Sequence, residues 1–240
     1  RLVEINTILN RFPSMARKLA KELNKNIELE IKGGETLVDR TIIDVIGDPL
    51  VHIIRNSIDH GIENEEERKK KNKEPKGKII IEVKKTDTEI QIIISDDGQG
   101  INLKKVKEKA IKNGLITEEK AEQMNEKEII ELITLPGFST AEKITELSGR
   151  GVGMDVVKNT IEKIRGSLTI NTELNKGTTM IITIPTSINL STVLLCIYNN
   201  NRYLIQQDYV YELLEISKQD IFIKDDKFYI DLSNKEVLNL

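Results

Sequence analysis

Aromatic residues and cysteine are scarce in this 240-residue chain. Phe, Tyr and Trp make up 4% of the residues, Trp is absent, and Cys196 is the single cysteine. So few aromatic side chains leave no stacking platform for single-stranded nucleic acid, and one cysteine excludes an internal disulfide. Cys196 lies in an apolar run from Val193 to Ile197, which predicts a buried thiol and not a nucleophile. A chain without a disulfide is expected in the reducing cytoplasm.

An excess of charge of one sign and a long apolar run are also missing. The net charge of −3 gives no support to general nucleic-acid binding. No apolar run is long enough to cross a bilayer, and no signal peptide follows Arg1. With 38% hydrophobic and 31% charged residues, the composition is typical of a soluble globular protein. Because the first residues carry no helix-start signal, we expect the chain to begin inside a longer protein.

The stretch from Asp48 to Gly61 predicts a helix with two different faces. Asp48 is a good N-cap, Pro49 suits the first helical position, and Gly61 is a natural end. At 100° per residue, one face gathers Leu50, Ile54, Ser57, Ile58 and Gly61. The opposite stripe holds His52, Asn56, Asp59 and Glu63, with His60 at its edge. Both histidines of the chain lie on the face that should not be core, which predicts one wall of a site.

The other elements are expected to alternate between helices and strands. Residues 1–24 are helical in composition, with an interruption at Arg11-Phe12-Pro13, and a short helix is predicted over 36–47. Strands are predicted at 27–31, 79–83, 90–95, 167–174 and 178–184, and a further helix at 154–164. The charge block at 65–71 is interpreted as a solvated helix end and loop. The polar, interrupted segment 102–147 is typical of a mobile lid.

The pattern changes after Pro185. Short strand-like segments separated by turns, such as Asn199-Asn200-Asn201, predict the start of a small β-barrel that the chain end cuts off. We therefore expect two domains, at residues 1–187 and 188–240.

Three glycine-rich motifs combine with the central helix. The motif Asp96–Gly100 follows a strand, Gly149–Gly153 precedes a helix, and Gly177-Thr178-Thr179 opens the last strand. A carboxylate at a strand end can accept a hydrogen bond from the exocyclic amine of adenine. A glycine-rich helix start offers backbone N–H groups to phosphates, and an Asn amide oxygen on the facing helix can ligate Mg²⁺. Together the motifs predict an ATP–Mg²⁺ site.

These four motifs resemble the N, G1, G2 and G3 boxes of the Bergerat-fold (GHKL) ATPases, which include gyrase, Hsp90, MutL and the histidine kinases. More narrowly, residues 48–63, 136–140 and 148–157 resemble the CheA family of chemotaxis histidine kinases, and residues 11–15 are similar to the segment that opens their catalytic domain. The resemblance covers residues 2–187 densely. It implies an α+β fold, a Bergerat α/β sandwich of a mixed sheet and helices, followed at 188–240 by a partial SH3-like β-barrel that would begin a CheW-like regulatory domain.

The resemblance also implies a role for each matching residue. Asn56 and His52 would ligate Mg²⁺ and, with Lys105, act in catalysis. Asp96 would hold the adenine amine, Gly98 and Gly100 would let the base approach, and Thr178 would support it. His60 and Lys105 would lie near the ribose or the phosphates. The triphosphate would be wrapped by Gly149, Arg150, Gly151, Val152 and Gly153, and the lid would include Phe138, Ser139 and Thr140.

Position 52 separates the subclasses of this resemblance. Bergerat ATPases that hydrolyse ATP with water, and most other histidine kinases, carry Glu four residues before the Asn, where this chain has His52. A neutral imidazole can serve as a general base or as a metal ligand. We favour a role of His52 at the metal and in orienting the acceptor, and the assignment of the base stays open.

The family resemblance implies an ATP-dependent protein histidine kinase of a chemotaxis two-component system. It would transfer the γ-phosphoryl group of ATP to a histidine on a separate phosphotransfer domain, in trans. The expected partners are that domain, a CheW-type coupling protein, chemoreceptors and, indirectly, response regulators; the full-length protein is expected to be a cytoplasmic homodimer recruited to membrane receptor arrays. Two alternatives are kept: a GHKL ATPase that uses ATP as a conformational clamp, and a non-catalytic signalling scaffold.

Overall fold

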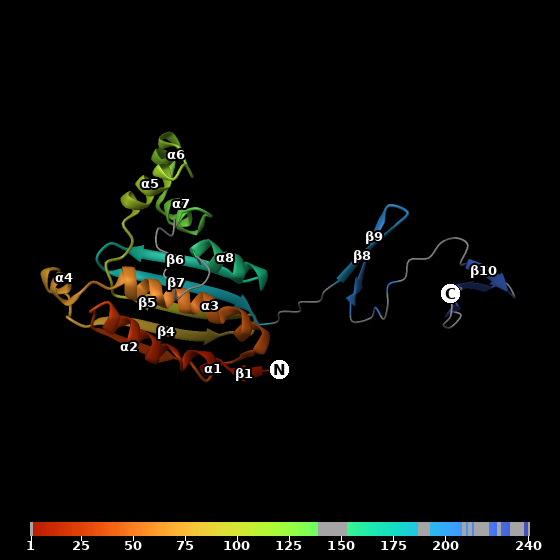
Figure 1. Ribbon diagram of the computed structural model, residues 1–240, viewed down its shortest axis with the longest axis horizontal. Helices are drawn as coiled ribbons and strands as arrows, with labels where there is room; N and C mark the ends of the chain where they lie inside the picture. The colour runs from red at the N-terminus through yellow and green to blue at the C-terminus, as the bar shows by residue number, and fades with distance from the viewer. Residues whose placement is uncertain are drawn as a thin grey trace. The chain divides into compact units, whose positions relative to one another are not determined.

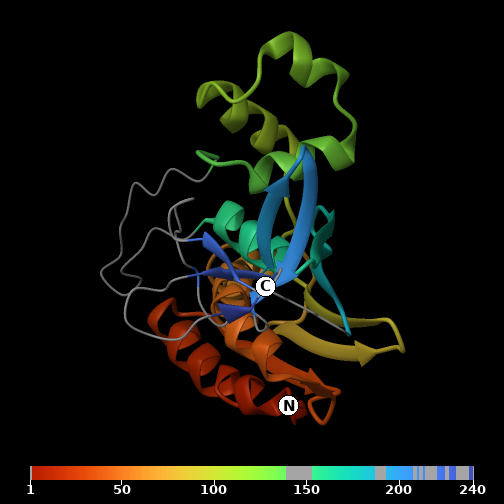
Figure 2. The ribbon, with the colours of Figure 1, turned by 90° about the vertical axis from the view of Figure 1, so that its right-hand side faces the viewer.

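The computed structural model describes residues 2–138, 153–186, 193–207, 210, 213, 221–224, 227–230 and 238–239. The chain divides into two compact units, residues 1–188 and 189–240 (Figures 1 and 2), and each is considered by itself. The elements of the first unit are β1 (Leu2–Glu4), α1 (Asn6–Leu9), α2 (Phe12–Glu22), β2 (Ile27–Lys32), β3 (Leu37–Asp39), α3 (Arg40–Asn56), η1 (Ser57–Gly61), α4 (Glu65–Lys70), β4 (Gly77–Lys85), β5 (Glu89–Asp96), α5 (Leu103–Lys112), α6 (Glu118–Gln123), α7 (Glu126–Glu131), η2 (Leu132–Thr134), α8 (Met154–Lys163), β6 (Ser167–Glu173) and β7 (Gly177–Pro185).

A five-stranded mixed sheet in the order β2-β4-β5-β7-β6 is the frame of this unit. Strand β2 runs parallel to β4, and the other neighbours are antiparallel. Buried and partly exposed residues alternate along β5, so that Ile90, Ile92 and Ile94 share one face. The five strands predicted here from their β-branched residues are therefore confirmed.

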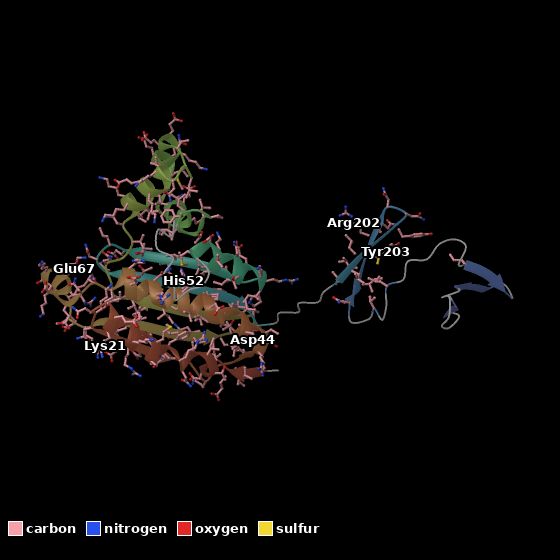
Figure 3. All side chains as sticks on the ribbon, viewed as in Figure 1. Lys21, Asp44, His52, Glu67, Arg202 and Tyr203 are labelled. Atoms are coloured by element: carbon pink, nitrogen blue, oxygen red, sulfur yellow. The ribbon has the colours of Figure 1, made fainter. Side chains whose placement is uncertain are left out.

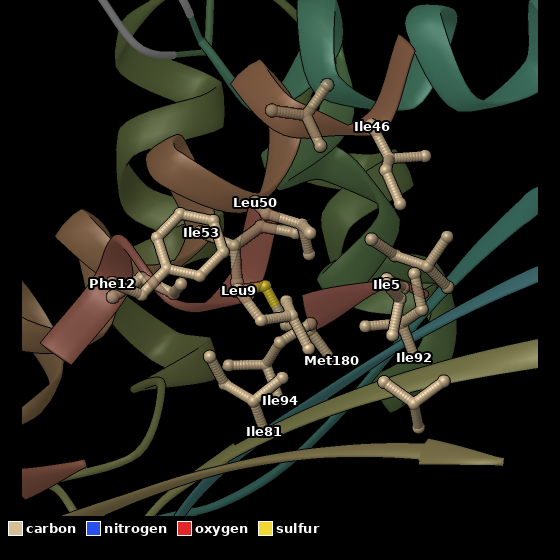
Figure 4. Packing of buried hydrophobic residues seen from close by; sticks show 14 of the residues in the cluster. Ile5, Leu9, Phe12, Ile46, Leu50, Ile53, Ile81, Ile92, Ile94 and Met180 are labelled. Atoms are coloured by element: carbon tan, nitrogen blue, oxygen red, sulfur yellow. The ribbon is translucent and has the colours of Figure 1, made fainter. Parts of the chain in front are cut away.

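Helices α2, α3 and α8 supply the apolar residues that cover this face of the sheet. Leu50 and Ile53 of α3 lie over Ile81, Ile92 and Ile94 of the sheet (Figure 4), and all five side chains are fully buried or nearly so. Burial of such side chains contributes about 1.5–3 kcal/mol each. The rigid core thus lies directly beneath the predicted site helix.

Helix α3 begins nine residues earlier than the sequence predicted. Its N-cap is Asp39, whose side chain accepts from the backbone N–H of Thr41 at 2.8 Å, and Pro49 lies inside the helix. The prediction that Asp48 caps the helix, and that a separate helix spans 36–47, is wrong. Apolar side chains are buried on both sides of the proline, at Ile46 and Leu50 among others, and this continuous packing outweighs the cost of Pro49.

The last turn of the predicted helix is a π-turn, η1. The backbone N–H of Ile62 bonds to the carbonyl of Ser57 at 2.7 Å, five residues back, and Ile62 then leaves the helix with an extended backbone. The wider turn breaks the rotation of 100° per residue after Asn56. Glu63 is consequently buried elsewhere, and the prediction that it shares a stripe with His52 and Asn56 is wrong.

The charge block forms helix α4, and most of its side chains are exposed, as the prediction of a solvated helix end and loop requires. Asn64 caps α4, and Asn72, with φ of 54°, ends it. The N–H groups of Asn72 and Lys73 bond to the carbonyls of Lys69 and Arg68, which is a Schellman motif. Arg68 is the exception: it is 1% exposed, so for this residue the prediction is wrong.

Helices α5, α6 and α7 form a separate cluster with its own small core (Figure 1). Val106, Ala110, Ile129, Leu132 and Phe138 belong to this core. The predicted interruption of segment 102–147 is confirmed as far as Phe138, because α5 ends at Lys112 and Gly114 adopts φ of 70°. The mobile lid stays a prediction.

The described residues of the second unit are β-rich. Strands β8 (Val193–Tyr198) and β9 (Asn201–Gln206) form a hairpin, and β10 (Ile221–Lys224), β11 (Lys227–Ile230) and β12 (Leu238–Asn239) form an antiparallel sheet. The C-terminal strands are confirmed, while the barrel and the CheW-like assignment stay predictions. Among the residues described in both units, no helix is long and apolar enough to cross a membrane.

Candidate functional site

The Asp96 carboxylate stands at the end of β5, where the sequence placed an adenine-binding group. Asp96 is paired across the sheet with Thr178 of β7, and both residues are largely buried. Its Oδ1 accepts from the backbone N–H groups of Gly98 at 3.1 Å and Thr178 at 3.3 Å. Thr178 is also tied to Thr172 through their hydroxyl groups at 3.1 Å. The structure therefore brings Asp96, Gly98 and Thr178 together.

Burial raises the pKa of the Asp96 carboxyl above its ordinary value, and the charge of Asp97 acts in the same direction. Hydrogen bonds from the Ser57 hydroxyl and from the N–H groups of Gly98 and Thr178 favour the ionised form and oppose the rise in the pKa. Burial makes the ionised form of the carboxyl unfavourable, so a further hydrogen-bond donor, such as an exocyclic amine, would stabilise it.

Two glycines of the Asp96–Gly100 motif lack a Cβ because the protein itself needs the space. A Cβ on Gly98 would clash with the carbonyl oxygen of Gly61. Gly100 has φ of 68°, and a Cβ there would clash with the carbonyl oxygen of Glu173. The N–H of Gln99 bonds to the Gly61 carbonyl at 2.8 Å, so the motif is locked against η1. That these glycines also admit the base stays a prediction.

The junction of α3 and α8 holds the predicted metal-binding side chains. The Asn56 side chain contacts the first residue of α8, with Nδ2 lying 3.5 Å from Sδ of Met154. Gly153 is the N-cap of α8. The unpaired backbone N–H groups of the first turn of α8 are therefore close to Asn56. The Asn56 amide oxygen has no partner among the residues that the structure describes. This arrangement brings Gly153 and Asn56 to one place.

His52 lies one helical turn before Asn56 on α3 (Figure 3) and is half-buried. Burial lowers the pKa of its imidazole below the ordinary value, Arg55 and His60 lower it further, and Asp155 opposes the change. His52 is therefore neutral at pH 7, with a ring nitrogen able to accept a proton or to ligate a metal. The geometry leaves both roles open.

His60 is on the exposed side of η1. Its side chain is 77% exposed, and Nε2 lies 3.8 Å from Oδ2 of Asp59. The Asp59 side chain is 44% exposed, and its backbone carbonyl accepts from Lys25 at 2.6 Å. His60 is therefore presented to solvent, and its predicted place near the ribose or the phosphates stays a prediction.

Lys105 lies in the first turn of α5, which Asn102 caps through a bond to the Lys105 N–H at 3.1 Å. A cavity of about 300 Å³ opens between this turn, Phe138 and the β6–β7 loop at Asn175. Lys105 lines this cavity, and its contact with a phosphate stays a prediction. A larger cavity of about 810 Å³, between the end of α2 and the start of α4, contains none of the predicted site residues.

Six predicted site residues cannot be placed. Ser139, Thr140, Gly149, Arg150, Gly151 and Val152 lie outside the described residues. Their predicted roles in the lid and in wrapping the triphosphate stay predictions.

Two lysines that the sequence did not single out hold backbone carbonyls of this site. Lys25 donates to the carbonyls of Ile58 and Asp59 in η1, at 2.8 and 2.6 Å. Lys73 donates to the carbonyls of Asp97 and Gly98, at 2.8 and 2.5 Å. The available signal was the dipeptide Asn-Lys, at 24–25 and 72–73, where an Asn of positive φ ends a helix.

Comparison with known proteins agrees with this geometry. Residues 46–188 match the family model described as Histidine kinase-, DNA gyrase B-, and HSP90-like ATPase. The chain is 46% identical over 231 residues to the chemotaxis protein CheA of Bacillus subtilis, covering 96% of this chain and 34% of that protein. It is 45% identical over 240 residues to the sensor histidine kinase CheAY of Helicobacter pylori (100% and 30%), and 44% identical over 221 residues to CheA of Listeria monocytogenes (92% and 36%).

The chain spans about a third of the length of these relatives. The predicted resemblance to the CheA family of chemotaxis histidine kinases is confirmed by identities of 44–46% over more than nine-tenths of the chain. The family model covers more than half of the chain and includes four of the five strands of the mixed sheet (β4 to β7), α8 and all but the first residues of α3. The chain belongs to the histidine kinase-, DNA gyrase B- and HSP90-like ATPase family.

Proposed function

We propose that this chain is the catalytic part of a chemotaxis histidine kinase and transfers the γ-phosphoryl group of ATP to a histidine of a separate phosphotransfer domain. The observation that carries the proposal is the buried Asp96 carboxylate, bonded to Gly98 and Thr178 and adjoining the turn that follows Asn56. One site then spans an adenine acceptor at one end and the start of α8 at the other.

Adenine recognition would rest on the charge of Asp96. Its Oδ1 already accepts two backbone N–H groups, and the Ser57 hydroxyl also bonds to the carboxylate. An ionised carboxylate has about four lone-pair sites, so room remains for an exocyclic amine. An amine in this position is present in adenine, whereas guanine has an oxygen there and would repel the carboxylate. The site would therefore select ATP over GTP.

Mg²⁺ would be held by the amide oxygen of Asn56 and a ring nitrogen of His52. Mg²⁺ takes few protein oxygens and keeps waters and phosphate oxygens, so a site with one or two protein ligands suits it. Within the described ranges, no cluster of three or more His, Cys, Asp and Glu side chains could hold a metal, which agrees with a shared site of this kind. When bound, the ion would neutralise charge on the β- and γ-phosphates.

The reaction would be an in-line displacement at the γ-phosphorus. A ring nitrogen of the acceptor histidine forms the N–P bond as the bond from the γ-phosphorus to the bridging oxygen breaks, and ADP leaves with that electron pair. The proton on the other ring nitrogen is lost to water or to a base. Since imidazole is already nucleophilic, the chain's task is mainly to orient ATP and to offer Lys105 and the α8 N–H groups to its phosphates.

Label transfer separates this proposal from its alternatives. The chain is incubated with Mg²⁺, γ-³²P-ATP and an added histidine-phosphotransfer domain. We expect acid-labile, alkali-stable label on that domain, at a low rate because the two parts are not tethered. Steady phosphate release without labelled protein would instead identify an ATPase that uses ATP as a conformational clamp, and absence of ATP binding in a calorimetric titration would identify a non-catalytic scaffold.

The second unit, residues 189–240, is proposed to begin a CheW-like regulatory domain that binds a CheW-type coupling protein. Support comes from apolar side chains exposed on both strands of the β8–β9 hairpin, at Leu195, Ile197 and Leu204, which a completed barrel or a partner would cover. The full-length protein would then be a homodimer that the coupling protein joins to chemoreceptors, with response regulators as later phosphoryl acceptors. Co-sedimentation of the full-length protein with receptor-containing membranes, with and without the coupling protein, tests this assembly.

A further inference from the structure

Two helices of the first unit end in the same way, and each ending delivers a lysine to the backbone of the site. Helix α2 ends with Asn24 at φ of 52°, and α4 with Asn72 at φ of 54°. In both, the N–H of the following lysine bonds to a carbonyl of the last full turn: Lys25 to Ala20 at 2.8 Å and Lys73 to Arg68 at 2.9 Å. These are two Schellman motifs with Asn in the left-handed position.

The Lys25 side chain holds the π-turn η1. Its ammonium group donates to the carbonyls of Ile58 at 2.8 Å and Asp59 at 2.6 Å. A π-turn leaves carbonyls without the usual partner four residues on, and Lys25 supplies the missing donors. Burial lowers the pKa of Lys25, while Asp59, Glu67 and Glu63 oppose the change, as expected of an ammonium group that the fold has partly desolvated.

The Lys73 side chain holds the Asp97-Gly98 turn in the same manner. Its ammonium group donates to the carbonyls of Asp97 at 2.8 Å and Gly98 at 2.5 Å, and to Oε1 of Glu63 at 3.0 Å. The side chain is 14% exposed and Glu63 is 2% exposed. Charge-assisted bonds from a mostly buried cation to two adjacent carbonyls fix the position of that peptide.

Buried Arg68 completes the support from the other side. It donates to Oδ2 of Asp97 at 2.8 Å and to Oε2 of Glu63 at 3.2 Å, and its Nε bonds to the Glu74 carbonyl at 2.6 Å. Burial works against ionisation of Glu63, but hydrogen bonds from Lys73 and Lys71 outweigh it, so the pKa of Glu63 lies below its ordinary value. Glu63 is therefore the charged anchor for the cations of this segment.

The carbonyls that Lys25 holds and those that Lys73 holds lie on opposite sides of the contact between Gly61 and Gly98. Gly98 packs against the carbonyl of Gly61 with no room for a Cβ, and the N–H of Gln99 bonds to that same carbonyl at 2.8 Å. Lys25 holds the residues just before Gly61, and Lys73 holds Gly98 itself. Asp96 Oδ1 takes its bond from the Gly98 N–H, so the direction of the carboxylate depends on where this contact sits.

We propose that Lys25 and Lys73 are positioning residues for nucleotide binding: each holds one side of the Gly61–Gly98 contact and so fixes the Asp96 carboxylate toward the adenine amine. The inference rests on the proposed function, because it takes Asp96 as the adenine acceptor. Neither lysine touches the nucleotide. Displacements of about 1 Å in a binding group can cost about 100-fold, so a loosened contact has a measurable effect.

The test replaces each lysine by methionine in the full-length protein and measures ADP and ATP binding by calorimetry, with phosphoryl transfer at saturating ATP. Lys71→Met is the matched control for Lys73→Met, since Lys71 donates to the same Glu63 oxygen at 3.1 Å but to no carbonyl of the turn. Lys21→Met, on the exposed side of α2, is the control for Lys25→Met.

We expect Lys73→Met and Lys25→Met each to lower the affinity for ADP and the affinity for ATP by the same factor, about 10-fold, because the two nucleotides share the adenine base. One nucleotide should still bind per chain, and the rate at saturating ATP should stay within about 2-fold of the unaltered protein. Lys73→Arg, which keeps a donor to the carbonyls, should recover most of the affinity. The two controls should change affinity by less than about 2-fold, as surface charges do.

A merely structural role gives a different result: fewer binding sites per chain, with the affinity of the remaining sites unchanged. That outcome overturns the proposal, as does an equal loss in Lys71→Met or a loss confined to ATP. If Lys73→Met does not fold, Lys73→Gln takes its place, because Gln retains a hydrogen-bond donor and part of the aliphatic side chain. The proposal then requires an equal but smaller loss of ADP and ATP affinity in Lys73→Gln. Absence of ADP binding in the unaltered protein would overturn the proposed function, whereas normal binding with no loss in the variants overturns this inference alone.

Discussion

The two ends of the site are built differently. At the Asp96 end, the carboxylate is buried, accepts backbone N–H groups of Gly98 and Thr178, and adjoins turns held by Lys25 and Lys73. At the other end, Lys105 is exposed, the Asn56 amide has only a 3.5 Å contact to the sulfur of Met154, and His52 is half-buried. The proposed base end already makes its hydrogen bonds without a ligand. The described residues of the proposed phosphate end offer side chains that a metal and phosphates would order.

This difference would suit the proposed kinase, which must exchange nucleotide. A preorganised base end gives affinity without an ordering cost, because its hydrogen bonds already exist. The phosphate-binding groups would become ordered only when Mg²⁺ and ATP are both bound. Phosphoryl transfer could then take place only in that complex. The comparison predicts that substitutions at the two ends act on different steps.

The largest effect is expected at the phosphate end, from Asn56→Asp. A carboxylate beside the start of α8 should still attract Mg²⁺ but would repel the γ-phosphate and disturb its alignment. Transfer to an added phosphotransfer domain should fall by at least about 100-fold, a size typical of a lost transition-state contact. The measurement is label transfer at saturating ATP. Magnesium-free ADP should bind with nearly unchanged affinity, and a loss of that binding would contradict the separation of the two ends.

The next effect concerns the base end, where Asp96→Asn removes the charge but keeps an oxygen for the Gly98 and Thr178 N–H groups. Affinity for ADP and ATP should fall together by about 10- to 100-fold, as hydrogen bonds to charged groups contribute about 1.5–3 kcal/mol. Because burial of the charge is unfavourable, the melting temperature should stay the same or rise. Unchanged binding by calorimetry would remove Asp96 from its assigned role.

Sequence reasoning located the ends of this site better than it located their support. The roles of Asp96, Asn56 and Thr178 were predicted from local motifs, and the structure brings Asp96 and Thr178 into contact because the register of β5 and β7 pairs them. The strands were predictable because the apolar residues that alternate in their sequences are the ones that face the core. Such features depend on residues that are close in sequence, so a local motif is enough to predict them.

The misjudged features depend on packing between distant segments. The neighbouring sequence does not show that Arg68 is buried, since its partner Asp97 is 29 residues away and approaches it only in the folded chain. Likewise, Asp48-Pro49 has the form of a helix start, and the continuous apolar face of α3 overrides it. The π-turn was hidden because a helical wheel assumes a constant rotation per residue.

A smaller effect is expected from Lys105→Met at the phosphate end. Lys105 is exposed, so its attraction for phosphates is screened by solvent and salt. We expect ATP affinity to fall by about 3- to 10-fold and ADP affinity by less, with the difference shrinking as salt is raised from 50 to about 300 mM. Lys104→Met, an exposed neighbour in the same turn, is the control and should change neither value. A loss equal for ADP and ATP would assign Lys105 to the base end.

The smallest effect is a pH dependence that belongs to the base end alone. The pKa of Asp96 is raised in the folded chain, so the carboxyl gains a proton at a higher pH than in the unfolded chain. The folded state therefore binds more protons between the two pKa values, and the contribution of Asp96 to stability falls as pH rises through that window and is restored as pH falls. Nucleotide binding has the opposite sign, because the protonated carboxyl is a weaker acceptor for the adenine amine. Lowering the pH through that window should thus weaken the binding of magnesium-free ADP, measured by calorimetry, with no loss of melting temperature attributable to this group. Asp96→Asn should bind ADP weakly and without this pH dependence, and persistence of the same slope in that variant would assign the titration to another group.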